Sequence, residues 1–402
     1  MKILACHNYY QQRGGEDCSF EQEAELLTSN GHQVVRYTLH NDQVDRVGKV
    51  ALAGKTIWNR AAYRDVLALI RRERPDVMHC TNTFPLLSPA IYYAARRERV
   101  PVIQALRNYR LLCPKAQFLR DGKVCEDCLN KLIPWAAVQH RCYRDDRAAT
   151  MVLSAMLVTH RLWRTWERQV TLFYTPSEFA RQTYIRAGFQ EDRVMVKPNF
   201  TTDNVRVGTG SGGYAVYVGR LSPEKGISTL LSAWSQLDLS LRLKVIGDGP
   251  DAQLVQQAAA QDSRIEWLGL RSITDILEIL ADATCLVFPS IWYETFGRTI
   301  IESFSVATPV VVARMGAMAE LVEEHHNGLL FTPGDAVDLV DKVRQLCELT
   351  SQNSRLRQGA RETYERLYTP QQNYDGLLAI YQQALRLDGV SDATRQLAVE
   401  AR

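Results

Sequence analysis

The chain alternates short apolar runs with longer amphipathic segments from one end to the other, and this alternation occurs twice. In the first half, β-branched and aromatic residues predict strands at residues 2–7, 33–37, 77–80, 100–105 and 170–174, with helices between them. The alternation restarts with predicted strands at residues 214–218, 241–246, 265–268, 285–288, 310–313 and 329–331. Because strands that alternate with helices form parallel sheets with crossover connections, the sequence predicts two α/β domains.

A glycine-rich segment separates the two predicted domains. Residues 201–213 contain four glycines among Ser and Thr, which is the composition of a flexible linker. A chain of 402 residues is also longer than a domain with a single hydrophobic core usually is. We therefore predict an N-terminal domain at residues 1–200, a linker at 201–213, a C-terminal domain at 214–370 and a final helix at 371–386. Two domains imply a cleft between them.

The composition restricts the class of protein. Hydrophobic residues make up 46% of the chain and charged residues 23%, as in ordinary globular enzymes. The start lacks the basic flank of a signal peptide, and no uncharged apolar run reaches about 18 residues, so we expect a cytoplasmic protein. Residues 1–200 carry 30 Lys and Arg against 20 Asp and Glu, and the remainder carries 18 against 25. The basic half indicates either a contact with anionic lipid or a phosphate-bearing acceptor, or an ordinary charged surface.

The first strand of the second domain leads into a loop that contains Gly219, Arg220, Lys225 and Gly226. Open α/β sheets bind ligands at the carboxyl ends of their strands. Arg220 can chelate phosphate oxygens and Lys225 adds a point charge, so the two can neutralise a diphosphate and the charge that develops as it leaves. A solvated basic turn is the alternative interpretation.

Gly14 and Gly15 lie between the first strand and the first helix. Paired glycines let the backbone approach a ligand, and a helix start offers free N–H groups to an anion, although a plain turn has the same pattern. The segment is not the G-x-G-x-x-G dinucleotide fingerprint. Hydride transfer is therefore disfavoured.

Two carboxylates follow the fourth strand of the second domain. Glu294 lies in the loop and Glu302 lies about a turn inside the next helix. Acid pairs at this spacing also arise by chance, so the context carries the argument. Carboxylates accept two or more hydrogen bonds from hydroxyls, which suits sugars and ribose. The backbone N–H groups of residues 295–297 can bind a sugar hydroxyl or a phosphate at the helix start.

In their order and domain placement, these elements and the segment at residues 245–250 resemble family 4 of the retaining glycosyltransferases, over nearly the whole chain. The resemblance implies the α/β GT-B fold, in which two facing Rossmann-like domains with parallel sheets enclose an interdomain cleft. It also implies a bacterial polysaccharide type of enzyme, no catalytic metal, and a C-terminal helix that crosses back to the N-terminal domain.

The resemblance further implies the chemistry. A sugar from a nucleotide-sugar donor, most favourably a UDP-sugar, passes to a glycan or a lipid-linked acceptor by front-face attack, and the leaving diphosphate takes the acceptor's proton. Glu302 would bind the ribose, Glu294 the donor sugar, and the two cations the diphosphate. The residues to which the resemblance assigns donor binding are Gly15, Arg220, Lys225, Glu294, Phe296, Gly297 and Glu302, with Arg220, Lys225 and Glu294 as the catalytic set.

One position departs from the family pattern. Many relatives have a His after the fourth strand of the first domain, where this chain has Arg107. Arginine cannot act as a base, but it can bind a hydroxyl, a phosphate or a carboxylate. His79, at the end of the third strand, is either a second cleft residue or a structural histidine.

Four of the nine cysteines are concentrated in a predicted insertion at about residues 107–147. Cys125 and Cys128 form a C-x2-C pair, and Cys113 and Cys142 complete a set that can hold a structural zinc ion. Reduced or redox-active thiols are the alternative, and a cytosolic protein disfavours disulfides. The insertion is also basic and aromatic, which indicates either a peripheral contact with the inner face of the membrane or a buried helix with a charged outer face.

Two other functions remain as alternatives. A sugar-nucleotide epimerase of the same fold also binds a diphosphate, but it needs acid and base groups for the sugar. A non-catalytic, zinc-stabilised binding module explains the cysteines and leaves the loop of Arg220 and Lys225 unexplained. Nucleic-acid binding is disfavoured, because no recognisable binding motif accompanies the basic charge.

Overall fold

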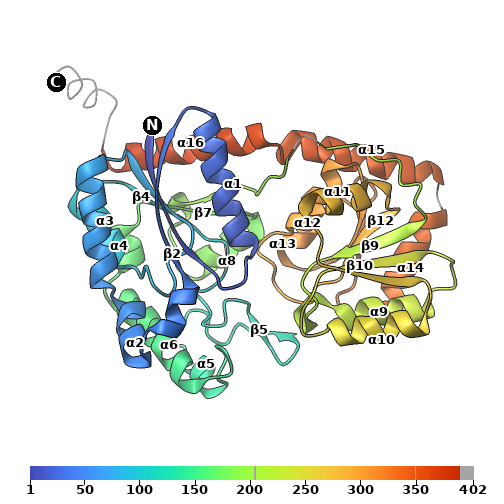
Figure 1. Cartoon of the computed structure of the whole chain (residues 1–402), viewed down its shortest axis with the longest axis horizontal. Coiled ribbons are helices and arrows are strands. Elements are labelled where there is room, and N and C mark those ends of the chain that lie inside the picture. The colour runs from blue at the N-terminus through green and yellow to red at the C-terminus, as the bar shows by residue number, and fades with distance from the viewer. Residues whose placement is uncertain (203–204, 349, 390–402) are drawn as a thin grey trace.

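The computed structural model describes residues 1–202, 205–348 and 350–389, and it contains two α/β domains side by side (Figure 1). Each domain has a six-stranded sheet whose strands are all parallel. The predicted α/β fold with two Rossmann-like sheets is therefore confirmed. Residues 203 and 204 of the predicted linker lie outside the described residues.

The sheet of the N-terminal domain has the strand order β2-β1-β3-β4-β7-β8. Its strands are β1 (Lys2–Tyr9), β2 (Gln33–His40), β3 (Val77–Cys80), β4 (Val102–Ala105), β7 (Leu172–Thr175) and β8 (Val194–Val196). The helices are α1 (Gly15–Ser29), α2 (Lys49–Ile57), α3 (Arg60–Glu73), α4 (Ala90–Arg97), α6 (Arg147–Leu162), α7 (Thr165–Gln169) and α8 (Glu178–Arg186), with the short 3-10 helices η1 (Asn41–Arg46) and η2 (Glu191–Arg193). β3 and β4 are buried along their whole length, which explains their continuous apolar character.

The cysteine-rich insertion contains little regular structure. Its elements are a hairpin of β5 (Leu119–Arg120) and β6 (Lys123–Val124), and the short helix α5 (Trp135–Gln139). In Figure 1 the hairpin extends from the N-terminal domain toward the C-terminal domain. The insertion therefore lies beside the junction of the two domains.

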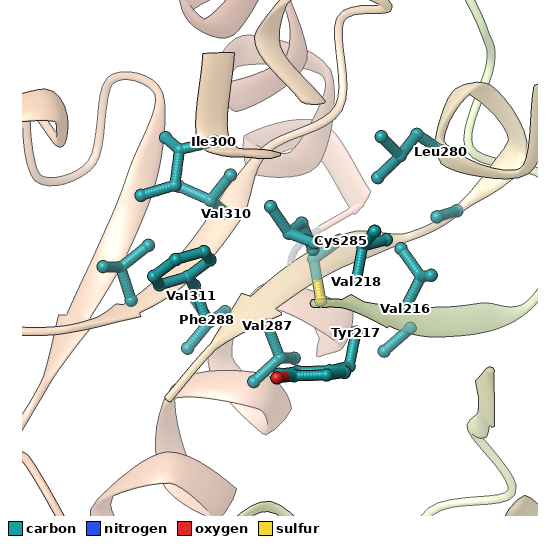
Figure 2. Packing of buried hydrophobic residues seen from close by; sticks show 14 of the residues in the cluster. Val216, Tyr217, Val218, Leu280, Cys285, Val287, Phe288, Ile300, Val310 and Val311 are labelled. Atoms are coloured by element: carbon teal, nitrogen blue, oxygen red, sulfur yellow. The ribbon is translucent and has the colours of Figure 1, made fainter. Parts of the chain in front are cut away.

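The sheet of the C-terminal domain has the order β11-β10-β9-β12-β13-β14. Its strands are β9 (Tyr214–Val218), β10 (Arg242–Ile246), β11 (Ile265–Gly269), β12 (Cys285–Phe288), β13 (Val310–Ala313) and β14 (Gly328–Phe331). The helices are η3 (Pro223–Lys225), α9 (Ile227–Gln236), α10 (Ala252–Gln261), α11 (Ile273–Asp282), α12 (Arg298–Ser305), α13 (Gly316–Leu321), α14 (Ala336–Glu348) and α15 (Thr350–Leu367). Figure 2 shows the aliphatic core in which Val216, Val287 and Val311 pack from neighbouring strands.

The sheet orders locate the ligand-binding edge. β9 is flanked by β10 on one side and by β12 on the other, so the direction of chain progression reverses between β9 and β12. Ligands bind at such a switch point, outside the carboxyl ends of the strands. The loops after β9 and β12 therefore flank the crevice of the C-terminal domain.

The last helix, α16 (Pro370–Leu387), packs on the N-terminal domain and crosses its sheet in Figure 1. Leu377, Ile380 and Tyr381 share a buried cluster with Ile3 and Ile103. Thr369 caps the helix and Pro370 occupies its first turn, which starts the helix close to the junction between the domains. The two domains are thus connected at both the linker and this helix.

None of the described helices is both long and apolar enough to cross a membrane.

Candidate active site

The loop after β9 and the loop after β12 touch each other. Gly226 follows η3 with φ of 73°, and a Cβ placed on it would lie 2.0 Å from the carbonyl oxygen of Pro289 in the other loop. Only glycine allows this approach. The contact brings Lys225 next to Glu294.

Lys225 and Glu294 form the centre of the candidate site. The Nζ atom of Lys225 lies 2.5 Å from Oε1 of Glu294, and the two side chains are 21% and 12% exposed. The same oxygen accepts hydrogen bonds from Ser290 Oγ at 3.0 Å and from Trp292 Nε1 at 2.9 Å. Within the described residues no donor bonds to the other oxygen, Oε2. Glu294 is therefore fixed in orientation and keeps one oxygen for a ligand.

Arg220 lies exposed at the end of β9. The structure gives its side chain no hydrogen bond or ion pair within the described ranges, while its backbone carbonyl accepts a hydrogen bond from the Tyr217 hydroxyl at 2.9 Å. An arginine whose main chain is fixed and whose guanidinium has no protein partner is suited to bind an anion. Arg220 and Lys225 thus supply two cations in the segment that follows β9.

Helix α12 begins at the same crevice. Gly297 precedes it with φ of 146°, and a Cβ there would lie 2.9 Å from Ile300 Cδ1, so a larger residue would distort the helix start. Phe296 is buried, and its ring packs against that of Tyr368 at 6.0 Å between centroids. Glu302 is buried one turn into the helix, and burial raises its pKa, while Arg298 at 3.9 Å lowers it.

The N-terminal domain meets this loop directly. Thr295 donates a hydrogen bond to the carbonyl oxygen of Arg107 at 2.9 Å, and Ser177 donates one to the carbonyl oxygen of Thr295 at 2.8 Å. Gly15 is exposed at the start of α1, and a Cβ there would lie 3.5 Å from Cδ of Arg298. Gly15 and the backbone of Arg107 therefore lie at the junction with the loop that contains Glu294.

The sequence interpretation missed two residues of this junction. Arg298 donates to Ser19 Oγ at 3.0 Å and to Gln22 Oε1 at 2.8 Å, and so ties α12 to α1. Asp17 accepts hydrogen bonds from the Gly14 backbone N–H at 2.9 Å and from His7 Nε2 at 2.7 Å, and so fixes the glycine loop. The acidic residue three positions after Gly14 was a detectable capping signal, whereas the contacts of Arg298 had none.

The side chains of Arg107 and His79 are buried inside the N-terminal domain. This corrects the expectation that Arg107 is a cleft residue, and for His79 it favours the structural histidine over the cleft residue. The Arg107 side chain is 4% exposed and donates hydrogen bonds to Glu23 at 2.5 Å and to Tyr174 at 3.2 Å. His79 lies between the hydroxyls of Tyr174 and Tyr381, each at 2.9 Å. Both are held by partners from other elements, which no local sequence pattern encodes.

The electrostatics of this buried cluster are set by burial and by close charges. Lys197 bonds to the carboxylate of Glu23, which Arg107 also contacts. Burial lowers the pKa of Lys197 to about 8 and that of His79 to about 4. The pKa of Glu23 lies well below its usual value, because the attraction of Arg107 and Lys197 outweighs the desolvation that raises it. The cluster therefore holds one carboxylate between two cations.

The four cysteines of the insertion line one cavity of about 10 Å³, together with Lys115 and Arg120. Burial raises the pKa of the Cys128 thiol to about 11, and the other three cysteines add to this rise. All nine cysteines are free thiols. Across the described ranges, no group of three or more His, Cys, Asp or Glu side chains is arranged to hold a metal ion.

Large apolar side chains are exposed at the end of the N-terminal domain formed by α5 and α6. Trp135 is 64% exposed and Leu162 is 63% exposed. The other exposed members of this apolar end are Leu132, Ile133, Met151 and Trp163. The same segments of the chain carry exposed cations, namely Lys131, Arg147, Arg164 and Arg168. The combination of apolar and basic side chains is typical of a surface that rests on an anionic bilayer.

Comparison with known proteins identifies the family of each domain. The family described as glycosyl transferase 4-like domain matches residues 14–199, and the family described as glycosyl transferases group 1 matches residues 208–363. An uncharacterised glycosyltransferase of Methanocaldococcus jannaschii is 28% identical over 39% of this chain, and the match spans 44% of its own length. A 42.6 kDa protein from the cps region of Klebsiella pneumoniae is 22% identical over 79% of this chain and 86% of its own.

A solved structure shows the same fold. The Anabaena protein HepE in complex with UDP superimposes with a TM-score of 0.69 at 19% identity, over 95% of this chain and all of that one. Each family match covers one domain, and together they cover most of the chain. The chain belongs to the GT-B glycosyltransferases of the family 4 type.

Proposed function

We propose that this glycosyltransferase is a retaining enzyme that moves a hexose from a nucleotide-diphosphate sugar, most favourably a UDP-sugar, to a glycan or lipid-linked acceptor in polysaccharide biosynthesis. The observation that carries the proposal is the pair of loops after β9 and β12, which brings Lys225 to the oriented carboxylate of Glu294, with Arg220 in the first of these loops. The UDP complex of the similar Anabaena structure favours uridine. The match to a protein of a cps region supports the polysaccharide role.

Arg220 and Lys225 would bind the diphosphate at the crevice mouth. As the bond between the anomeric carbon and the diphosphate oxygen breaks, these cations would stabilise the charge that develops on the leaving group. The acceptor hydroxyl would form its bond to the anomeric carbon on the same face, and its proton would pass to the departing phosphate oxygen. No protein nucleophile is needed in this sequence of events.

The carboxylates would position the donor. The free Oε2 of Glu294 would accept hydrogen bonds from the hydroxyls of the sugar, and its Oε1 would hold Lys225 in place. Glu302 would accept hydrogen bonds from the ribose. The N–H groups of Phe296 and Gly297, and that of Gly15 across the junction, would contact the sugar and its phosphates. These steps require no catalytic metal.

Nucleotide binding tests the donor site first. A ligand that binds the folded state alone raises the melting temperature, so we expect UDP to produce the largest shift among UDP, GDP, ADP and CDP. The shift should disappear in Lys225→Ala and persist in Lys342→Ala, which alters another Lys–Glu pair of the same domain. Equal shifts in wild type and Lys225→Ala would remove the diphosphate assignment.

The stereochemistry of the product tests retention. With an α-linked donor, proton NMR of the isolated product should show an α-linkage, because front-face attack keeps the configuration of the anomeric carbon. A β-linked product would overturn the retaining mechanism and leave nucleotide binding untouched. A product with an altered sugar and no new linkage would instead favour the epimerase.

We also propose a peripheral contact with the inner face of the membrane, through the exposed apolar end of α5 and α6. We expect binding to vesicles that contain phosphatidylglycerol and weaker binding to vesicles of phosphatidylcholine alone. Replacing Trp135 and Trp163 together by Ser should abolish binding, while Leu270→Ser, on an equally exposed Leu of the other domain, should not. Equal binding by both variants would contradict the contact.

A further inference from the structure

The cysteine-rich insertion is held by few regular interactions. Besides the two-residue strands β5 and β6, it contains the five-residue helix α5. Seven of the thirteen described non-glycine residues with positive φ lie in it, namely Ala116, Phe118, Asp121, Asn130, Arg141, Arg144 and Asp145. A left-handed backbone at a residue with a side chain persists only where surrounding structure imposes it. A cross-link between side chains would stabilise such a backbone.

The four cysteines occupy the positions at which such a cross-link would act. Cys113 precedes the hairpin, Cys125 and Cys128 follow it, and Cys142 follows α5. They line the same cavity, whose volume is about 10 Å³. The remaining five cysteines lie outside the insertion. The convergence is thus specific to the four cysteines whose sequence separation spans the insertion.

We propose that Cys113, Cys125, Cys128 and Cys142 bind one structural zinc ion. Zinc–thiolate bonds of about 2.3 Å place the four sulfurs roughly 3.8 Å apart, close to the contact distance of packed thiols. The four thiols do not have this arrangement in the described structure, so metal binding requires their side chains to rotate within the cavity that they already line. Lys115 and Arg120 line the cavity and offset the negative charge of four thiolates around a divalent ion.

The zinc site bears on the donor loop through Phe118, which lies between Cys113 and the C-x2-C pair. The Phe118 ring lies 5.0 Å from Tyr109 and 6.4 Å from Tyr293, measured between ring centroids. Tyr293 directly precedes Glu294 and also packs on Phe179 at 4.9 Å. Within the C-x2-C pair itself, Glu126 forms an ion pair with Arg186 at 3.2 Å. The metal therefore fixes one wall of the crevice without touching the substrate.

The test measures metal directly and does not depend on the proposed reaction. The full chain, produced without a histidine tag, should contain one zinc per molecule by elemental analysis. Cys125→Ser combined with Cys128→Ser should lose at least nine-tenths of it, and Cys347→Ser, on a half-buried cysteine outside the insertion, should retain it. Exchange of the wild-type metal for cobalt should give the thiolate charge-transfer and ligand-field bands of a tetrahedral site.

A second measurement covers the case in which the double variant fails to fold. Titration of wild type with a mercurial should release zinc after the reagent has bound the four thiols, with the metal followed by a chromogenic chelator. Wild-type protein without zinc, with all nine thiols free in mass spectrometry, would overturn the proposal. A disulfide between Cys125 and Cys128 in protein purified without reductant would overturn it in favour of a redox role.

Discussion

Two of the Lys–Glu ion pairs in the described structure have the same composition and opposite surroundings. Lys225 and Glu294 meet in the crevice of the C-terminal domain, and their side chains are 21% and 12% exposed. Lys197 and Glu23 meet inside the N-terminal domain, where the side chains are 2% and 4% exposed. The chemistry of the pair is the same, so any difference in role arises from its partners and its access to ligand.

The two glutamates differ in how many of their carboxylate oxygens already accept hydrogen bonds. Glu23 uses both oxygens, because Arg107 and Lys197 contact Oε1 and the Tyr174 hydroxyl donates to Oε2. Glu294 concentrates three donors on Oε1 and keeps Oε2 for a ligand. The buried pair of Lys197 and Glu23, in which both carboxylate oxygens have partners, stabilises its domain. The partly exposed pair of Lys225 and Glu294, in which one carboxylate oxygen has no partner among the described residues, can bind a substrate. The comparison predicts separable defects in stability and in catalysis.

The largest effect should follow Glu23→Ala. Removing this carboxylate leaves Arg107 and Lys197 buried as unpaired cations, which costs about 3–5 kcal/mol of the free energy of unfolding. Urea unfolding, followed by hydrogen exchange in β1 and β3, would isolate the N-terminal domain. Glu25→Ala on the exposed face of the same helix serves as the control, with a change within about 0.5 kcal/mol. A loss below about 1 kcal/mol in Glu23→Ala would show that the cluster is not structural.

The same cluster should make the N-terminal domain sensitive to acid. The pKa of His79 is about 4 in the folded protein, below its ordinary value of 6.5, which applies to the unfolded chain. As the pH falls, the unfolded chain therefore takes up the proton before the folded protein does. Stability should therefore decrease between pH 6.5 and 4, by at most about 3 kcal/mol. Glu23 stays ionised in this window, and Lys197 and Arg107 stay charged. His79→Gln, which can still bond both tyrosines, should flatten the curve; an unchanged slope would contradict the assignment.

Sequence reasoning located the crevice pair and missed the buried pair for one physical reason. Strand ends and helix starts are encoded locally, and β9, β12 and β13 begin and end at the predicted residues because buried apolar runs are bounded by turn signals. Glu23 lies 84 positions before Arg107 and 174 before Lys197. No periodicity connects residues at such separations, so an arginine near the cleft in sequence was expected to face it in space.

Short elements were missed for a related reason. The edge strand β8 has three residues, and β5 and β6 have two each. Strands this short contain too few residues for a pattern of alternating apolar and polar side chains to be recognised. The convergence of the four cysteines was predictable in outline from the C-x2-C pair. The side chains that close their cavity, Lys115 and Arg120, were not, because their placement depends on the hairpin.

In the crevice pair, Lys225→Ala should reduce kcat/KM by about 100-fold, the usual cost of one preorganised donor to a developing charge. The free energy of unfolding should change by less than about 1 kcal/mol, because the side chain is partly exposed and Ser290 and Trp292 still satisfy Glu294. Steady-state kinetics with the donor identified by thermal shift would measure the first quantity. A rate within threefold of wild type would place the catalytic charge elsewhere.

The smallest effect should come from Arg298→Gln. The Arg298 side chain connects the loop region of Glu294 with the buried cluster around Glu23. Arg298 bonds to Ser19 and Gln22 on α1, and Ser19 lies beside Asn199, a partner of Arg107 in the buried cluster. Loss of these bonds should loosen the domain junction and raise KM for the donor about three- to tenfold, with about 1 kcal/mol lost from the contacts. Arg314→Gln, whose Glu324 pair lies in the same domain, should leave KM unchanged. An unchanged KM in Arg298→Gln would mean that the buried cluster and the crevice act independently.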